Sequence, residues 1–423
     1  MAHPMPEMMD RFGENLVVRN VGSEQDAERF VALSAKINGE AEGILCARLI
    51  QHHPATTWDD YTLVEDERTG EVVSTTCLIP WRMQYENVTL YAAMLEMVVT
   101  HPEYRRRGLV RAQIERFHRT TRTRGFDLNI IQGIPYYYRQ YGYTYALDHQ
   151  PHDGLPAALI PPPSADITGA YQVRRATLDD IPALTALYHA SLVQNRMYTL
   201  RTPAYWRYLL QPAQHDVRVI NESQHDGQLL GYIAIHGARG PQGIEVSECG
   251  ATSHSAAMAL LSHLTTETHG LIRLGGAGHN AVLQAAQSLG STPLAHDQWL
   301  IHITDIAGFL MKIGPALEQR VSQSDCAGLS AQVCINLFRE AFLLHFERGK
   351  LAEVSGLGFV DASMGADGGD LCIPRDALVR LALGYRGLDE LRDAWPDIVV
   401  RPGSRHLFDV LFPRMASCVW MPY

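Results

Sequence analysis

The sequence of 423 residues lacks closely spaced cysteines. The seven cysteines that it does contain are Cys46, Cys77, Cys249, Cys326, Cys334, Cys372 and Cys418. An odd number of widely separated cysteines, without a C-x-x-C pair, argues against both a disulfide framework and a zinc site. We therefore predict no metal site and a reducing compartment, the cytoplasm.

The sequence also lacks the long apolar runs that a membrane protein needs. No run approaches the ~20 residues of a transmembrane helix, and the segment Met1–Phe12 lacks the apolar core of a signal peptide. The net charge of −10 argues against a general nucleic-acid binder. We therefore expect neither membrane nor nucleic acid among the partners of this chain.

The prolines divide the chain. Its length suggests two to four domains, and residues 151–170 have the proline-rich, polar composition of a linker. A pattern of alternating strands and helices precedes this segment in residues 1–150, and a new pattern of the same kind begins in residues 171–304. From Asp305 onward the pattern of predicted strands and helices changes again. We predict three domains of mixed α/β type, the third covering residues 305–423.

The stretch from Leu95 to Arg111 carries the strongest chemical signal. It predicts a buried strand, a turn at Pro102, and a helix whose first turn holds three consecutive arginines and Gly108. A glycine lets a ligand approach the backbone, and free N–H groups at a helix start favour an anion. Arginines add forked donors that suit phosphate oxygens. The stretch therefore predicts a site for a ligand that carries a pyrophosphate.

This stretch resembles motif A of the GNAT acyltransferase superfamily, R-x-x-G-x-G/A, with Arg105, Gly108 and Val110 at its three positions. Val110 replaces a small residue, so we expect crowding there. The resemblance implies that the motif binds the diphosphate of coenzyme A and that the preceding strand binds the pantetheine arm through its backbone. The implied contacts are Val98, Val99, Thr100, Arg106, Arg107, Gly108, Leu109, Val110 and Arg111. The alternative is an ordinary amphipathic helix with a solvated basic face.

A second signal is a run rich in tyrosine, from Gly133 to Tyr143. It resembles the Y-x-x-x-G-(F/Y) motif of GNAT proteins, a superfamily that includes the enhanced intracellular survival (Eis) acetyltransferases. In that group the tyrosine four residues before the glycine is the general acid, which implies Tyr138 here, with Gly142 as the glycine. The same resemblance implies coenzyme contacts at Gly133 and Ile134. The alternative is that these tyrosines are packed aromatic side chains.

The end of the chain also resembles the Eis group. Residues Leu371–Arg386 resemble part of its sterol-carrier-like C-terminal domain. In that group the terminal carboxylate is the catalytic base, which implies the α-carboxylate of Tyr423. A free, disordered end is the default for a chain terminus, although Trp420 and Pro422 favour a docked one. The implied fold is two tandem GNAT folds followed by a sterol-carrier-like α/β domain. The second GNAT fold lacks the phosphate-binding motif.

A glycine-rich stretch in the second domain offers a competing interpretation. Gly276, Gly278 and Ala281 follow a predicted strand in the pattern G-x-G-x-x-A, and Asp297 lies at about the distance expected of a dinucleotide site. Such a fingerprint belongs in the first βαβ unit of its domain, whereas this one comes late. We therefore interpret it as a glycine-rich connection.

Together these features predict an N-acetyltransferase that uses acetyl-coenzyme A as co-substrate and transfers the acetyl group to a primary amine by direct attack. No cysteine occupies a motif position, which argues against an acyl-enzyme. Aminoglycosides, polyamines and lysine side chains all remain open as acceptors. The Eis resemblance implies a homo-oligomer such as a hexamer. The alternatives are a non-catalytic protein that binds an apolar ligand in its C-terminal domain, and a nicotinamide enzyme that uses Gly276 and Gly278.

Overall fold

The computed structural model describes residues 10–12, 15–162, 169–211, 215–223, 228–277, 280–295, 297–363 and 368–423. The chain divides into two compact units. The first consists of Met1–Leu147, Trp299–Arg414 and Tyr423, and the second consists of Asp148–Gln298 and Met415–Pro422. Within the described residues, no helix combines the length and apolar character needed to cross a bilayer.

The first unit is built on a mixed sheet with the order β1-β2-β3-β4-β5-β6-β16-β7. Its strands are β1 (Asp10–Phe12), β2 (Leu16–Asn20), β3 (Tyr61–Asp66), β4 (Glu71–Tyr85), β5 (Val88–Thr100), β6 (Leu128–Ile131), β7 (Thr144–Asp148) and β16 (Gln298–His302). Pairing is antiparallel from β1 to β5 and parallel between β5 and β6. Most residues of β5 are buried, including the four from Ala92 to Leu95, which agrees with a strand in the middle of this sheet.

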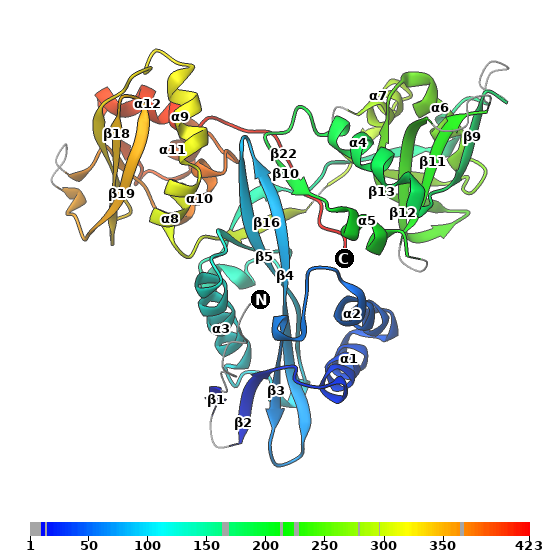
Figure 1. Cartoon of the computed structure of the whole chain (residues 1–423), viewed down its shortest axis with the longest axis horizontal. Helices are drawn as coiled ribbons and strands as arrows, with labels where there is room; N and C mark the ends of the chain where they lie inside the picture. The colour runs from blue at the N-terminus through cyan, green and yellow to red at the C-terminus, as the bar shows by residue number, and fades with distance from the viewer. Residues whose placement is uncertain are drawn as a thin grey trace. The chain divides into compact units, whose positions relative to one another are not determined.

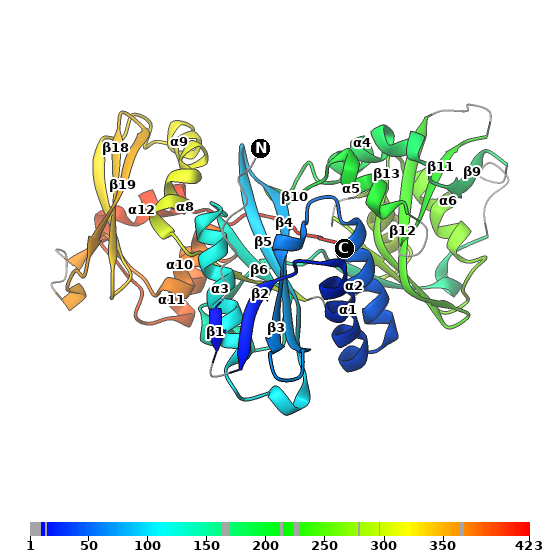
Figure 2. The same cartoon turned by 60° about the horizontal axis from the view of Figure 1, so that its bottom comes forward.

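Three helices cover this sheet. Helices α1 (Glu24–Asn38) and α2 (Glu40–His52) lie on one face, and α3 (Leu109–Thr123) lies on the other (Figure 1, Figure 2). The apolar stripe of α3 faces inward, and Ile114 and Phe117 pack with Leu95 of β5 in one hydrophobic cluster. Burial of this stripe fixes the direction in which α3 leaves the end of β5.

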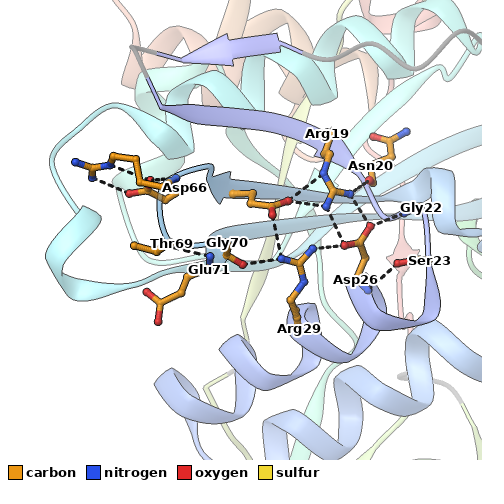
Figure 3. A network of polar contacts seen from close by, with 12 residues as sticks. Arg19, Asn20, Gly22, Ser23, Asp26, Arg29, Asp66, Thr69, Gly70 and Glu71 are labelled. Carbon is orange, nitrogen blue, oxygen red and sulfur yellow. Dashed lines mark hydrogen bonds and ion pairs between the residues drawn. The ribbon is translucent and has the colours of Figure 1, made fainter.

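A network of charged side chains fastens α1 to the edge of the sheet (Figure 3). The Arg19 guanidinium of β2 forms ion pairs with Asp26 of α1, at 2.5 Å, and with Glu65 of β3, at 2.6 Å. Arg29 of α1 also pairs with both carboxylates. The hydrogen bond from Arg19 holds the pKa of Asp26 well below its ordinary value. Ser23 caps the same helix end by accepting from the Asp26 N–H at 3.1 Å.

The start of α3 differs from the prediction. Residues Pro102–Tyr104 form a separate 3-10 turn, and α3 begins at Leu109. Arg106 and Gly108 have positive φ angles of 60° and 82°, and this left-handed backbone interrupts any helix that starts earlier. The three arginines therefore lie on a loop before the helix, whereas the sequence predicted them in the first turn of the helix itself.

The C-terminal part of the first unit has a sheet of its own, in the order β19-β18-β17-β20-β21. Its strands are β17 (Ala331–Asn336), β18 (Ala341–Glu347), β19 (Lys350–Gly358), β20 (Leu371–Cys372) and β21 (Val399–Val400). Its helices are α8 (Ile306–Lys312), α9 (Gly314–Ser322), α10 (Arg375–Ala382), α11 (Leu388–Ala394) and α12 (Arg405–Leu411). The Tyr85 hydroxyl at the end of β4 donates to the Ala382 carbonyl at 2.7 Å and so ties this part to the first sheet.

The second unit contains the sheet β15-β8-β14-β13-β12-β11-β9. Its strands are β8 (His152–Pro156), β9 (Tyr171–Arg175), β11 (Asp216–Glu222), β12 (Leu229–Gly240), β13 (Gly243–Ala251), β14 (Leu271–Gly275) and β15 (Thr292–Pro293). Its helices are α4 (Ile181–Ser191), α5 (Pro203–Leu209), α6 (His254–Leu264) and α7 (Ala281–Ser288). Strand β8 comes from the segment predicted as a linker. Its residue Leu155 is fully buried, so apolar residues among the prolines were enough to place it in a sheet.

The tail of the chain is packed. Strand β22 (Ser417–Cys418) pairs in parallel with β10 (Met197–Leu200) in the second unit. Val419 and Met421 are buried, and Tyr423 belongs to the first unit. A free terminus would not bury apolar side chains in this way.

Candidate acetyl-coenzyme A site

The central feature of the site is the point where β5 and β6 separate. Their parallel pairing runs only from Ala92 to Met94 on β5. Beyond it the register between β4 and β5 shifts, and Met97 has a positive φ of 50°. The Thr75 hydroxyl donates to the Met97 carbonyl at 3.0 Å and stabilises this bulge. The edge of β5 from Leu95 to Thr100 is therefore free of β6, and this edge includes Val98 and Val99, where a pantetheine arm was predicted.

The start of α3 lies directly after this strand. Gly108 occupies its N-cap position with φ 82°, and no side chain caps the helix. The left-handed backbone at Gly108 favours glycine, and a Cβ there would also lie 3.2 Å from Cζ of Phe12, which would have to shift slightly. The first-turn N–H groups therefore lack a side-chain acceptor, which is the arrangement that binds phosphate at a helix start.

The basic side chains around this helix start are exposed. The Arg107 guanidinium lies 4.6 Å from the centre of the Tyr104 ring, and that of Arg111 lies 5.1 Å from the centre of the Tyr141 ring. Stacking on rings leaves much of each guanidinium available for an anion. Val110 is partly buried and packs against the hydrophobic cluster that includes Ile114 and Phe117, and the crowding expected there stays a prediction.

Tyr138 lies beneath this surface in the 3-10 helix Tyr137–Tyr141, and only 4% of it is exposed. A Cβ on Gly133 would come within 2.1 Å of the Tyr138 ring, so the ring rests directly on the glycine backbone. Burial, followed by the charge of Glu96, raises the pKa of the Tyr138 phenol well above its ordinary value. Tyr138 therefore stays protonated at neutral pH and can donate. Ile134, the other residue predicted here, is 67% exposed.

Glu96 is a site residue that sequence reasoning missed. It lies on β5 immediately before the bulge and is partly exposed. Burial by the surrounding protein raises its pKa to about 7, while hydrogen bonds from the Tyr423 side chain and the Met97 N–H act in the opposite direction. The available signal was that Glu96 is the one charged residue in strand β5. The structure thus brings Tyr138 and Tyr423 together around a carboxyl group on β5.

The competing dinucleotide pattern has a different local structure. Asn280 caps α7, and its side-chain oxygen accepts from the N–H groups of Val282 and Leu283 at 2.9 and 3.0 Å. A Cβ on Gly276 would lie 2.7 Å from this same side chain. The first-turn donors that would bind a pyrophosphate are therefore already used. Gly278 lies outside the described residues.

One group of side chains has the spacing of metal ligands among the described residues. Donor atoms of Asp325, Cys326 and His406 lie within 4.8 Å of one another. The His406 Nε2 contacts the Asp325 carboxylate at 2.6 Å, and both side chains are mostly exposed. An exposed ion pair accounts for this arrangement by itself, so the absence of a metal site remains a prediction.

Comparison with known proteins identifies the domain in which these residues lie. Residues 23–146 match the profile of the acetyltransferase (GNAT) domain, whereas no curated protein gave a significant match. Several solved structures share the fold over nearly the whole chain.

A GCN5-related N-acetyltransferase from Anabaena variabilis ATCC 29413 has 14% identity and a TM-score of 0.69, over 96% of this chain and 99% of that one. A conserved protein of unknown function from Enterococcus faecalis V583, described as a probable N-acyltransferase, has 14% identity and a TM-score of 0.70, over 97% and 100%. Eis1 from Mycobacterium abscessus has 16% identity and a TM-score of 0.61, over 95% and 98%. At these identities the likeness shows the fold. The separated strands, the uncapped helix and Tyr138 all lie within the matched residues, and the chain therefore carries a GNAT-type acetyltransferase domain in residues 23–146.

Proposed function

We propose that the protein transfers the acetyl group of acetyl-coenzyme A to a primary amine. The observation that carries this proposal is the continuous path from the unpaired edge of β5 to the uncapped start of α3. A strand edge offers N–H and C=O groups to the amide-containing pantetheine arm, and the helix start offers N–H groups to the diphosphate. Both lie inside the acetyltransferase domain.

The coenzyme contacts follow this path. We assign the pantetheine arm to the backbone of Val98, Val99 and Thr100, and the thioester carbonyl to the N–H near Val98. The diphosphate is assigned to the run Arg106–Arg111, in which the exposed arginines supply charge. Gly133 and Ile134 border the arm on the side of β6. This arrangement stabilises the developing oxyanion through a fixed N–H donor.

The reaction is proposed as a direct attack, with each proton accounted for. A base removes a proton from the acceptor ammonium, the amine nitrogen bonds to the acetyl carbonyl carbon, and the C–S bond then breaks. Tyr138 donates its phenolic proton to the departing thiolate, and the second proton that the nitrogen loses on becoming an amide restores the Tyr138 phenol. The base assigned by the Eis resemblance is the α-carboxylate of Tyr423. In support of this assignment, the Tyr423 side chain is hydrogen-bonded to Glu96, whose charge also acts on the Tyr138 phenol.

We also propose the domain organisation of the Eis group: a catalytic domain in 1–150, a second GNAT-like domain in 171–304 that has lost coenzyme binding, and a sterol-carrier-like domain in 305–423. The second unit supports this, because β13 and β14 are parallel and α6 connects them. A homo-oligomer and a cytoplasmic location remain part of the proposal.

Calorimetry with acetyl-coenzyme A, followed by a screen of amines with detection of the released thiol, tests the function. We expect binding heat and thiol release that depends on the amine. A non-catalytic carrier of apolar ligands predicts no heat, and a nicotinamide enzyme predicts heat with a reduced dinucleotide instead. Substitution of Arg106 or Arg111 by glutamine should weaken coenzyme binding, because each removes a charge beside the diphosphate.

A further inference from the structure

A cluster of polar side chains is buried between β4, the end of β5 and α3, and the reaction proposed above does not use it. Its members Ser74 of β4 and Gln113 of α3 are almost completely buried. The Ser74 Oγ lies 2.7 Å from Oε1 of the Gln113 amide and 2.9 Å from the Val99 carbonyl oxygen. It also lies 2.8 Å from the Thr100 hydroxyl. The cluster therefore joins α3 to the end of β5, the two elements assigned to acetyl-coenzyme A.

The Ser74 hydroxyl cannot donate to both of the carbonyl oxygens beside it. A hydroxyl has one proton and two acceptor lone pairs, and a carbonyl oxygen can only accept. The Val99 carbonyl and Oε1 of Gln113 therefore compete for a single proton. The Nε2 of Gln113, in contrast, is a buried donor without a hydrogen-bond partner among the described residues, and an unpaired buried donor is costly.

A half-turn of the Gln113 amide resolves this competition. Nε2 then takes the place of Oε1 and donates to Ser74, and the hydrogen-bond network is what decides between these two orientations. The Ser74 proton is left for the Val99 carbonyl, and the Thr100 hydroxyl donates to the second lone pair of Ser74. The amide oxygen then lacks a donor, but buried carbonyl oxygens are left unpaired more often than buried N–H groups are.

The end of β5 is held at a second carbonyl as well. The Thr75 hydroxyl donates to the Met97 carbonyl at 3.0 Å, so consecutive residues of β4 bind carbonyls that lie two residues apart on β5. The backbone groups of successive residues in a strand point to opposite edges. The N–H and C=O groups of Val98, between these two residues, therefore point to the edge that β6 leaves free.

We propose that Gln113 is a positioning residue for acetyl transfer. Its Nε2 donates to Ser74, Ser74 in turn fixes the Val99 carbonyl, and the neighbouring N–H of Val98 is thereby held toward the thioester, where a fixed donor stabilises the oxyanion. The inference rests on the proposed function, which assigns the thioester carbonyl to the N–H near Val98. It adds a residue of α3 that controls this contact without touching the coenzyme.

Three variants test the inference. Gln113→Met replaces the amide by an apolar group of similar size, Ser74→Ala removes the hydroxyl, and the third protein carries both changes. Thr121→Val is the matched control, because it removes an equally buried hydroxyl of α3, which donates to the His118 carbonyl at 3.1 Å. For each protein we would measure the free energy of unfolding, the hydrogen exchange of Val98–Thr100 without ligand, the Kd of acetyl-coenzyme A, and kcat with spermidine as the amine.

We expect Ser74→Ala to lower kcat about tenfold, which is roughly what one buried hydrogen bond is worth, and Gln113→Met to lower it by a similar factor. The double variant should lose no more than Ser74→Ala alone, because the amide acts through the hydroxyl. Hydrogen exchange of Val98–Thr100 should become several-fold faster in all three variants, while the Kd of acetyl-coenzyme A changes little. The control should lose stability and keep the wild-type kcat and exchange rate.

The inference is overturned by additive losses of kcat in the double variant, or by wild-type kcat and exchange in Gln113→Met. A parallel loss in Thr121→Val would also overturn it, because a general weakening of α3 would then explain the effect. A failure of the proposed function looks different. A wild type that neither binds acetyl-coenzyme A nor releases thiol refutes the acetyltransferase reaction, and hydrogen exchange of the free protein still decides whether Gln113 holds this strand.

Discussion

Two strands of this protein, β5 in the first unit and β13 in the second, carry a glutamate at matching positions, and they differ in what surrounds it. Glu96 has Tyr423 as a hydrogen-bond donor and no cation among the groups that shift its pKa. Glu248 forms a bidentate ion pair with Arg201, and both residues are buried. The same position on the two strands therefore carries a carboxyl with a raised pKa in the first unit and an internal ion pair in the second.

The gap beside each strand shows the same contrast. In the first unit, β5 continues for six residues beyond its last pair with β6. In the second unit, the Gln150 amide donates to the Ser247 carbonyl, and the Cys249 thiol donates to the Gly275 carbonyl at 3.3 Å. These side chains thus bridge β13 to its neighbours just beyond its last pair with β14. This agrees with the proposal that the second domain has lost coenzyme binding.

The helix that follows each strand differs as well. The N-cap of α3 is Gly108, which has no side chain to cap the helix. The N-cap of α6 is Ser253, whose hydroxyl accepts from the Ala256 N–H at 3.2 Å. The serine hydroxyl accepts from an N–H group of the helix's own first turn, whereas a glycine leaves these N–H donors available to an anion. The comparison predicts which changes damage the fold and which damage binding.

The largest effect is expected for Arg201→Met. It leaves the buried Glu248 without its cation, and such a change destabilises a protein by about 3–5 kcal/mol. Chemical denaturation should show this loss. Arg174→Met is the control, because the pair between Arg174 and Asp180 is partly exposed and should contribute about 1 kcal/mol or less. Equal losses in the two variants would mean that Glu248 is not held by Arg201 in the way that the contacts suggest.

Tyr138→Phe should come next and should act only on catalysis. Removal of the proton donor to the thiolate should lower kcat about 100-fold, while the Kd of acetyl-coenzyme A stays the same. Ser253→Ala, at the corresponding helix start of the second unit, should leave kcat unchanged. Steady-state kinetics and calorimetry measure both quantities. A Tyr138→Phe variant with the wild-type kcat would remove this tyrosine from the mechanism.

Glu96→Gln should change how stability depends on pH. The pKa of Glu96 is raised in the folded protein from 4.5 to about 7, so its favourable contribution is fully present below pH 4.5 and is lost as the pH rises through 7. Thermal unfolding at pH 5 and pH 8 should therefore show a smaller decrease in Tm for the variant than for the wild type. An identical decrease would mean that Glu96 titrates like an exposed carboxyl. The Glu248→Gln variant should not show this smaller decrease in Tm, because the change leaves the Arg201 charge unpaired.

The smallest effect is expected for Ser253→Ala, which should cost about 1 kcal/mol of stability in the second unit, as the loss of a helix cap does. Its counterpart Gly108→Ala should in addition weaken acetyl-coenzyme A binding, because it forces a side chain into a left-handed backbone beside the helix start. Chemical denaturation and calorimetry distinguish the two. Loss of coenzyme affinity in Ser253→Ala would contradict the assignment of the site to the first unit.

Local features of this fold could be predicted from the sequence. The order of strand β5, the turn at Pro102 and helix α3 was predicted from local residue patterns, whereas the chemistry assigned to the arginines and to Tyr138 stays a prediction. The pairing of Glu96 with Tyr423 could not be predicted, because it joins residues far apart in the chain. The start of α3 at Leu109 was also missed, since nothing in an arginine predicts the positive φ of Arg106. Strand β8 was predicted as part of a linker, because its apolar residues lie among prolines and polar residues.

The way Tyr138 is held has a consequence for how it works. Its ring is fixed by the Gly133 backbone and by neighbouring aromatic rings, and its hydroxyl has no hydrogen-bond partner among those found for the described residues. The ring is thus immobilised while the O–H bond stays free to rotate. Such a proton source does not have to break an existing bond before it delivers its proton, and a single methyl group at position 133 would be enough to misdirect it.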